Sequence, residues 1–254
     1  MPRRVIDSFA LAMIELTMFH PQGPSFWELV AQALSATERG YDMLAPKFEY
    51  TPYRTPDAIL APSIECLRQS GPIEAALDLC CGTGAAMRQL RPLCRRVVGI
   101  DFSRGMLQVA HHAVLQAPDK ASIELVRGNV LAMPFAAAFD VAVCFGALGH
   151  IRNREQSQLI TAVSQVLKPG GRFGFVTSGM PSWRSARYWR SRGFNAAMHV
   201  RNLLLSPPFV MYYLTFTLPQ VVDQLVAQGF SVAVHRDVFT GRYRDLAFLI
   251  ATKL

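Results

Sequence analysis

The sequence is poor in charged residues, and acidic residues are the scarcest. Charged residues make up 17% of the 254 positions, whereas hydrophobic residues make up 51%. This balance excludes a disordered chain, because disordered segments combine low hydrophobicity with high net charge. No acid lies between Glu155 and Asp223, and the formal net charge is +8. Such an excess permits attraction to nucleic acid, anionic lipid or a negatively charged substrate, but it does not specify a fold.

Cysteine is also sparse and shows no ordered spacing. The chain has five cysteines, an odd number, and two of them are adjacent at Cys80 and Cys81. Neither a disulfide framework nor a set of metal ligands has this pattern. We therefore expect no metal site, free thiols and a cytoplasmic protein, because reducing compartments keep thiols free.

Long hydrophobic runs are absent as well. Residues 5–19 follow two arginines, as in a signal peptide, but Asp7 and Glu15 interrupt them and no small-x-small cleavage site follows. An amphipathic helix is the prediction there. Residues 202–222 carry no charge and approach the length of a membrane span, but three prolines and several polar residues interrupt them. We predict that this segment does not span a membrane.

Two parts of the chain differ in pattern. Up to about residue 70 the pattern is helical, with a capping box at 25–28 and a helix start at 55–57. From Glu74 onward, short apolar runs alternate with helical stretches, which indicates a parallel sheet covered on both faces. The predicted strands are 75–80, 96–100, 122–126, 139–145, 172–176, 230–239 and 243–252, and the predicted helices between them are 85–93, 103–115, 155–167 and 219–228.

These patterns predict an α/β fold. We expect a doubly wound, seven-stranded and mostly parallel Rossmann-like sheet, with a C-terminal antiparallel β-hairpin joined at 240–241 and an N-terminal helical cap. The expected organisation is a cap or lid over residues 1–70 and a core over residues 71–254. Within the core, an insertion at 179–218 is expected to form a further lid.

A glycine-rich loop follows the first predicted strand. In Asp78-Leu-Cys-Cys-Gly-Thr-Gly84 the glycines let the backbone approach a ligand just before a helix N-terminus. The next strand ends in Asp101, whose carboxylate can accept hydrogen bonds from both hydroxyls of a ribose. Dinucleotide-binding enzymes have a third glycine where this chain has Met87. An adenosine ligand without a pyrophosphate therefore fits better.

Five motifs in this order resemble those of the class I S-adenosylmethionine-dependent methyltransferases, in particular the small-molecule, type 11-like branch. The resemblance runs from about Tyr41 to the C-terminus and implies S-adenosylmethionine as cofactor and S-adenosylhomocysteine as product. The motifs are Leu77–Gly84, Val98–Leu107, Gly128–Phe135, Phe139–Ile151 and Leu167–Arg172, and Tyr41-Asp42 is similar to the family's lid sequence.

The resemblance also implies a role for each matching position. Asp78 would orient the methionine ammonium group, and Asp101 would bind the ribose at the rim of the pocket. Asn129 stands where the family usually has an acid that accepts from the adenine amino group, and an amide oxygen can also accept. Backbone at Cys80, Gly82 and Gly84 would line the methionine portion, Phe102 and Met106 would flank the adenine, Phe145 would face the methyl group, and Tyr41 and Val130 complete the predicted cofactor-binding set.

His150 is the one catalytic candidate. It follows the fourth strand, where a general base could reach a substrate. The alternative, which we favour, is a histidine that hydrogen-bonds the backbone and stabilises its loop, because methyl transfer depends more on alignment and desolvation than on a strong base. Asp78 and Asp101 likewise have a purely structural alternative, as helix caps.

The insertion mixes arginine with aromatic residues between Trp183 and Arg192. Such a mixture can bind nucleic acid, but arginines at 184, 187 and 190 also fall on one solvated helix face. A lid helix with a basic outer face therefore explains the segment without nucleic acid. The acceptor site is expected between this lid and the N-terminal helices, with Phe194, Met198, Phe209, Met211, Tyr212, Tyr213 and Phe216 as candidate lining residues.

The predicted function is methyl transfer to an oxygen, nitrogen or carbon nucleophile of a small, apolar molecule. One alternative is a membrane-associated lipid or quinone precursor as acceptor, with peripheral contact between the insertion and an anionic membrane. Two others are an RNA methyltransferase and a non-catalytic partner protein that binds S-adenosylmethionine. We do not expect nucleic acid as a partner, because the fourth strand lacks the Asn/Asp-Pro-Pro-aromatic motif of enzymes that methylate adenine amino groups.

Overall fold

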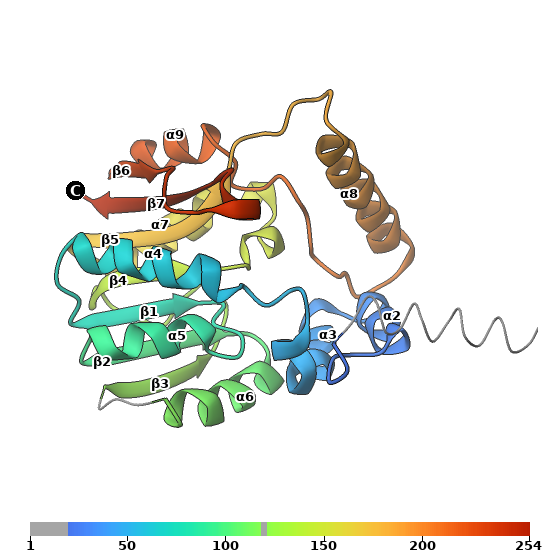
Figure 1. Cartoon of the computed structure of the whole chain (residues 1–254), viewed down its shortest axis with the longest axis horizontal. Helices are drawn as coiled ribbons and strands as arrows, with labels where there is room; N and C mark the ends of the chain where they lie inside the picture. The colour runs from blue at the N-terminus through green and yellow to red at the C-terminus, as the bar shows by residue number, and fades with distance from the viewer. Residues whose placement is uncertain (1–19, 118–120) are drawn as a thin grey trace, which may run out of the picture.

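Seven strands form one mixed sheet (Figure 1). The computed structural model describes residues 20–117 and 121–254. The strands are β1 (Ala75–Leu79), β2 (Arg96–Asp101), β3 (Ser122–Arg127), β4 (Phe139–Cys144), β5 (Leu167–Ser178), β6 (Phe230–His235) and β7 (Leu246–Lys253). Their order in the sheet is β3-β2-β1-β4-β5-β7-β6. Strands β1 to β5 are parallel, and β7 runs antiparallel to both β5 and β6. The predicted doubly wound sheet with a terminal antiparallel hairpin is confirmed.

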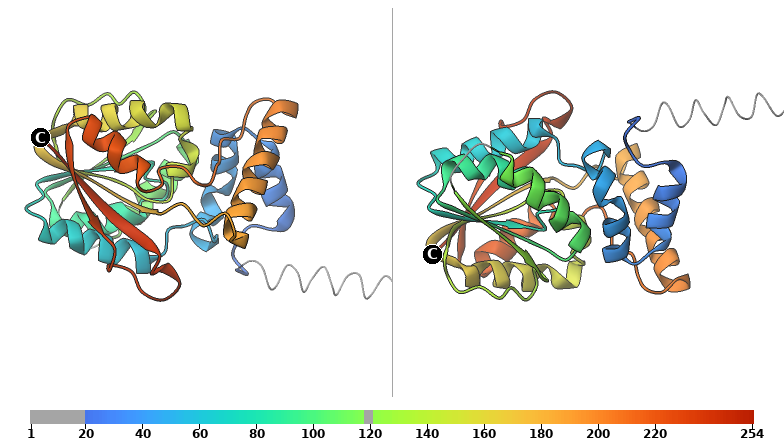
Figure 2. Two further views of the ribbon diagram at one scale, coloured as in Figure 1. Left: turned by 90° about the horizontal axis from the view of Figure 1, so that it is seen from above. Right: turned by 90° about the horizontal axis from the view of Figure 1, so that it is seen from below.

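Helices cover both faces of this sheet (Figure 2). The covering helices are α4 (Asp57–Gln69), α5 (Ala85–Leu90), α6 (Arg104–Leu115), α7 (Gln156–Val166) and α9 (Gln220–Ala227). Apolar residues of α7 and α9 pack into one core cluster, and those of α4, α5 and α6 pack into the other. All five residues of β1 are buried, which explains the continuous apolar run that predicted it.

Three boundaries differ from the sequence prediction. The hairpin connection is longer than the two-residue turn expected at 240–241, because Phe239 packs into the core and a 3₁₀ turn, η5 (Gly241–Tyr243), follows. Strand β5 begins at Leu167, which pairs with Phe139 before a shift in register. Helix α4 begins one residue later than expected, with Pro56 as its N-cap and no side-chain cap.

A cap of helices lies beyond the carboxyl ends of β1, β2 and β4 (Figure 1). Its N-terminal part begins with the predicted capping box, in which the Ser25 hydroxyl accepts from the Glu28 N–H at 3.3 Å and the Glu28 carboxylate accepts from the Ser25 N–H at 2.7 Å. The helix predicted over 5–19 lies outside the described residues. The cap elements are α2 (Phe26–Leu34), α3 (Thr37–Leu44), η1 (Ala45–Tyr50) and α8 (Ala186–Leu204), and the remaining short turns are η2 (Arg91–Leu93), η3 (Leu148–His150) and η4 (Asn153–Glu155).

The side chain of Asp42 attaches α3 to the core. Its carboxylate accepts from the Gly105 N–H at 2.8 Å and from the Ser103 hydroxyl at 2.7 Å, at the start of α6. A negative charge is favourable there, because unpaired N–H groups and the helix dipole make this end of a helix positive. The second residue of the Tyr41-Asp42 lid motif thus connects the cap to the core.

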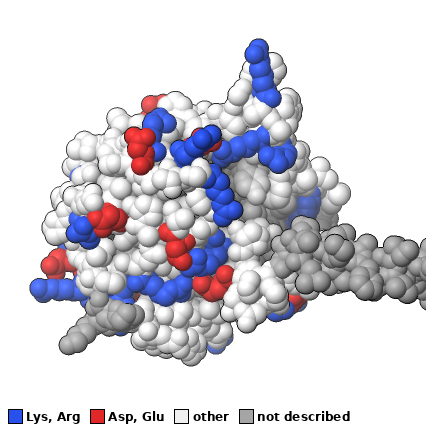
Figure 3. All heavy atoms as spheres, in the orientation of Figure 1, with Lys and Arg blue, Asp and Glu red and all other residues white. Residues whose placement is uncertain are grey.

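Helix α8 is fastened to an irregular segment, residues 208–213, which we call the strap. Asn195 bonds both backbone groups of Tyr213 at 2.8 Å, and Asn202 bonds both backbone groups of Phe209 at 2.9 Å. The strap in turn bonds α3 through the Thr37 hydroxyl, which accepts from the Val210 N–H at 2.8 Å. Basic side chains gather at the upper right of the molecule, where α8 lies (Figure 3). None of the helices in the described part of the chain has the length and apolar character of a membrane span.

Candidate functional site

A cavity of about 220 Å³ lies where the carboxyl ends of β1, β2 and β4 meet the cap. This is the edge at which open α/β sheets bind ligands. Nine of the residues predicted from sequence line it: Tyr41, Asp78, Cys80, Gly82, Asp101, Phe102, Met106, Phe145 and His150. Three others, Gly84, Asn129 and Val130, do not.

Asp78 lines this cavity and has a buried acceptor atom without a partner. The residue is only 2% exposed, and its Oδ2 atom has no hydrogen-bond partner among the described residues. Burial, together with the nearby Asp101, raises the pKa of Asp78 to about 8. Buried polar atoms are almost always paired in proteins, so an unpaired carboxylate oxygen in a cavity indicates a ligand with a donor or a positive charge.

Asp101 lies deeper than the rim position expected from sequence, since it is 5% exposed. Its two oxygens accept from the Ser103 N–H at 2.8 Å and from the Gly82 N–H at 2.9 Å. Burial raises its pKa, and these N–H donors offset part of the rise. Each carboxylate oxygen retains a further lone pair. Asp101 can therefore accept from ligand hydroxyls while it also shapes the glycine-rich loop. It does not cap a helix, because the N-cap of α6 is Ser103 and α5 has no side-chain cap.

The two glycines of the loop have different tasks. Gly82 has a φ of 52°, and a Cβ built on it would meet no atom within 4 Å, so its backbone borders open space. Gly84 has a φ of 79°, but a Cβ there would lie 2.6 Å from Cγ2 of Val114. Gly84 is thus required for the packing of α5 on α6 and does not line the cavity. Cys80, where the family usually has glycine, also adopts a positive φ of 53°.

Asn129 and Val130 lie outside the cavity lining. The Asn129 side-chain oxygen accepts from the Leu131 N–H at 2.9 Å, which closes the turn after β3. Val130 is buried in the apolar core. The structure therefore places neither residue in the lining of this cavity, and the adenine contact that the resemblance implies for this stretch stays a prediction.

His150 is bonded through both ring nitrogens. The Tyr41 hydroxyl lies 2.7 Å from Nε2, and the carbonyl oxygen of Val210 lies within hydrogen-bond distance of Nδ1. A carbonyl can only accept, so Nδ1 is protonated and Nε2 accepts from Tyr41. Burial lowers the pKa of His150 and raises the pKa of Tyr41, which keeps both groups neutral. The one nitrogen that could act as a base, Nε2, already accepts a hydrogen bond from Tyr41. This arrangement favours the interpretation of His150 as a residue that stabilises its loop.

Comparison with known proteins identifies what this chain is similar to. Residues 76–171 match the family model described as a methyltransferase domain. Over this region the chain resembles a methyltransferase domain. Its similarity to demethylmenaquinone methyltransferases is 37% identity over 112 residues for the protein of Lactococcus lactis and 37% over 111 residues for that of Lactiplantibacillus plantarum. These matches cover 42% and 41% of this chain, and 42% and 45% of the relatives. The chain therefore spans about half the length of the curated relatives it matches.

Solved structures show the same fold for this methyltransferase domain. An S-adenosylmethionine-dependent methyltransferase from Methanosarcina mazei superposes with a TM-score of 0.57 at 21% identity, over 75% of this chain and 97% of that one. The N-methyltransferase NodS from Bradyrhizobium japonicum, in complex with S-adenosylhomocysteine, gives a TM-score of 0.60 at 15% identity, over 86% and 99%. At these identities the likeness concerns the fold. The predicted resemblance to class I methyltransferases is confirmed.

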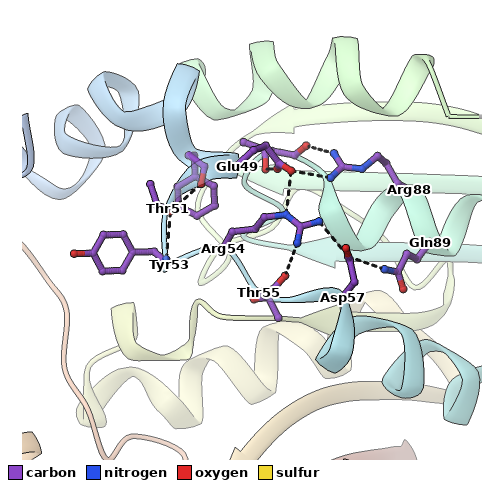
Figure 4. A network of polar contacts seen from close by, with 10 residues as sticks. Glu49, Thr51, Tyr53, Arg54, Thr55, Asp57, Arg88 and Gln89 are labelled. Atoms are coloured by element: carbon purple, nitrogen blue, oxygen red, sulfur yellow. Dashed lines mark hydrogen bonds and ion pairs between the residues drawn. The ribbon is translucent and has the colours of Figure 1, made fainter. Parts of the chain in front are cut away.

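Sequence reasoning missed an ionic network at the mouth of the glycine-rich loop (Figure 4). Glu49 accepts from the Thr83 hydroxyl, from Nε of Arg54 at 3.0 Å and from Arg88 at 3.2 Å. Arg54 also bonds Asp57 at 3.1 Å and lines the cavity. Burial lowers the pKa of Arg54, but the two carboxylates outweigh it and raise the pKa above its ordinary value. Among the described residues that line the cavity, only Arg54 has a permanent positive charge.

The expected acceptor-lining set was largely wrong for this cavity. Of its members only Met211 lines it. Phe216 is a core residue that packs against Phe175, because the chain turns inward there to pair with β5. Tyr212 and Tyr213 line a separate groove beside α8. The lining residues that sequence reasoning did not name are Phe48, Tyr53, Arg54, Thr55, Leu60, Cys81, Thr83, Ala85, Ala86, Gly146 and Ala147.

Proposed function

We propose that this protein transfers the methyl group of S-adenosylmethionine to a small, apolar acceptor. The observation on which the proposal depends is the unpaired Oδ2 atom of buried Asp78, in a cavity that also contains Asp101 and the open backbone of Gly82. When bound, the cofactor supplies a methyl group on a positively charged sulfur, which a nucleophile can displace in line. The residues of the cavity fit that ligand group by group.

The polar side chains match the polar ends of the cofactor. Asp78 would accept from the methionine ammonium group, and Arg54 would pair with the methionine carboxylate. Asp101 would accept from the ribose hydroxyls through its remaining lone pairs. Phe102 and Met106, which line the cavity at the start of α6, would pack against the adenine.

The acceptor side is apolar and has no free base. The Nε2 atom of His150 already accepts from Tyr41, so the side chains would act by positioning the acceptor and excluding water. The curated relatives are named for demethylmenaquinone, and a quinone-type ring is therefore the first acceptor to test. An electron-rich carbon of the reduced ring would form the C–CH₃ bond as the S–CH₃ bond breaks, and the displaced ring proton would pass to water.

We also propose that residues 20–56 form a cap or lid and that the insertion at 179–218 is a second lid. The core then consists of residues 71–254 together with α4, which was predicted as part of the cap but packs on the sheet. The strap borders the cavity through Met211, and Tyr41 of α3 borders it from the other side. Hydrogen exchange should be faster in 179–218 than in β1 and β4, and should slow there when S-adenosylhomocysteine binds. A cytoplasmic location is part of the proposal, since none of the five cysteines, all within the described residues, is in a disulfide.

Calorimetry and a turnover assay test the function. We expect S-adenosylhomocysteine to bind and NAD to bind far more weakly, and we expect methyl transfer to reduced demethylmenaquinone with a short prenyl chain. Arg54→Gln should weaken cofactor binding at least tenfold. Arg95→Gln, at a side chain 86% exposed on the opposite edge of the sheet, is the matched control. NAD binding tighter than S-adenosylhomocysteine binding would refute the cofactor assignment, and intact cofactor binding without turnover of any quinol, phenol or amine would refute the reaction.

A further inference from the structure

One face of α8, which we call its outer face, is apolar and exposed. Its exposed fractions are 62% at Trp189, 56% at Val200, 84% at Leu203 and 74% at Leu204. Residues three and four apart share a helix face, and Gly193, Ala196 and Ala197 complete this one. The opposite face bonds the strap through its asparagines, so the outer face has no partner within the described residues. The arginines expected to face solvent, at 184, 187 and 190, are exposed, but the exposed side of α8 also has this apolar face, which was not predicted.

Arginines lie on either side of this apolar face. Helical spacing places Arg190 on one side and Arg192 on the other, and both are exposed. Arg187 is also exposed, but two residues before Trp189 it lies nearer the opposite side of the helix. Arg184 precedes the helix and lies over the Trp183 ring. Apolar residues in the centre with cations at both borders are typical of helices that lie in a bilayer interface.

A groove of about 850 Å³ runs beside the same helix. It is lined by Arg152, Arg154 and Arg192, with Trp189 and His199 on the helix side, and no acid contributes to it. Within the described residues, neither Arg154 nor Arg192 forms an ion pair with a carboxylate. The groove therefore offers uncompensated positive charge next to the apolar face, a combination suited to the phosphate of a lipid headgroup.

Helix α2 extends the apolar surface at this end of the molecule. Trp27, Phe26 and Leu34 are exposed on it. The Arg201 guanidinium of α8 donates to the carbonyl of Ala33 at 3.0 Å and to that of Ser35 at 2.8 Å, which joins the two helices (Figures 1 and 2). The pair therefore presents apolar side chains from two connected helices.

We propose that the outer face of α8 docks on an anionic bilayer. Trp189, Val200, Leu203 and Leu204 would enter the interface, while the flanking arginines would contact lipid phosphates. A symmetric contact with a second copy would bring the same arginines together without any acid between residues 156 and 222 to balance them. Nucleic acid would pair with the arginines but would leave the leucines in water. The proposal rests on the proposed function in one respect: a bilayer is the natural source of an apolar acceptor.

Sedimentation with vesicles tests this docking. We expect the full chain to bind vesicles of equal parts phosphatidylcholine and phosphatidylglycerol, and to bind pure phosphatidylcholine vesicles far more weakly. The triple change Arg187→Gln, Arg190→Gln and Arg192→Gln should lower affinity for the anionic vesicles roughly a hundredfold, and added salt should have a similar effect. The change Leu203→Ser with Leu204→Ser should lower it about tenfold or more even at low salt.

Exposed arginines at the other end of the molecule supply the control. Arg95→Gln with Arg68→Gln removes two exposed cations at the amino ends of the strands, away from α8, and should leave binding to the anionic vesicles unchanged. Equal binding by the triple arginine variant and the wild type would overturn the proposal. So would a concentration-dependent dimer that the Leu203→Ser, Leu204→Ser variant abolishes, or tighter binding to single-stranded RNA than to vesicles. Calorimetry with S-adenosylhomocysteine on every variant separates the two proposals, because vesicle binding without cofactor binding would refute only the enzyme function.

Discussion

Replacing Asp78 by asparagine tests whether the charge of this buried carboxylate destabilises the ligand-free protein and is needed for ligand binding. The side chain is 2% exposed, its Oδ2 atom has no partner in the described part of the protein, and its pKa is raised to about 8. Asparagine has the same shape and cannot ionise. Its oxygen can keep the hydrogen bond from the Met87 N–H, and its amide group would then face Asp101. We expect Asp78→Asn to stabilise the ligand-free protein and to weaken cofactor binding.

The size of the gain follows from the shift in pKa. In the unfolded chain Asp78 titrates near 3.8, and in the folded protein near 8, so the folded state holds an extra proton between these values. The wild-type free energy of unfolding must therefore fall as pH rises from about 4 to 8, and level off above 8. At about 1.4 kcal/mol per pH unit, the loss from this group reaches about 4 kcal/mol at neutral pH. Asp78→Asn removes that loss.

Urea denaturation at pH 5, 7 and 9, as round test values for the titration window, measures this difference. The variant should be more stable than the wild type by about 1–2 kcal/mol at the lowest pH, by about 4 kcal/mol at neutral pH and by about 6 kcal/mol at the highest pH. In calorimetry, the variant should bind S-adenosylhomocysteine about ten- to a hundredfold more weakly, because a charge-assisted hydrogen bond to the ammonium group is lost. Wild-type affinity should also rise with pH up to about 8. A variant whose stability follows the wild-type pH dependence would refute the reasoning.

Three further substitutions test the other positions of the site. Asp101→Ala should lower the free energy of cofactor binding by about 2–4 kcal/mol. It should also lower the free energy of unfolding in urea by about 1–3 kcal/mol, because the N–H groups of Ser103 and Gly82 lose their acceptor. Unchanged cofactor affinity would argue against the ribose contact. His150→Ala should lower turnover less than tenfold and leave the shape of the pH–rate profile unchanged, whereas a loss of a hundredfold or more would indicate a general base. Gly84→Ala should cost about 2–4 kcal/mol in thermal unfolding, and adding Val114→Ala should restore part of it; no loss would mean that the helix contact is not tight.

The sheet and the polar pair at its edge were predictable from sequence because local patterns encode them. Buried parallel strands are continuous apolar runs, and the residues that follow β1 and β2 must meet at one edge of the sheet. Asp78, Gly82 and Asp101 therefore came together as expected. Gly84 was predicted to line the ligand site, but the structure shows that a side chain there would collide with Val114. The sequence shows that a glycine is present and does not show which neighbour requires it.

The other parts of the site depend on contacts between distant segments. Glu49 meets Thr83 and Arg88 across more than thirty residues, and no spacing rule connects an acid in a short 3₁₀ turn to a glycine-rich loop. Met211 reaches the cavity because the strap crosses it, whereas Phe216 turns into the core. Both lie in an irregular segment that has no periodicity from which to assign a face. The apolar outer face of α8 was not predicted, because periodicity groups residues into faces and does not say which face packs.

Hydrogen bonds connect the cavity to the face that we propose docks on a membrane. Tyr41 borders the cavity and bonds His150, whose other nitrogen bonds Val210 in the strap. The strap is paired with α8 through Asn195 and Asn202. An apolar acceptor that leaves a bilayer at α8 would meet the strap before it meets the cofactor, so one segment separates both ligands from water. This arrangement explains why a histidine without a free basic nitrogen lies at the centre of the site: it fixes the position of the strap, and displacement at a charged sulfur depends on that enclosure.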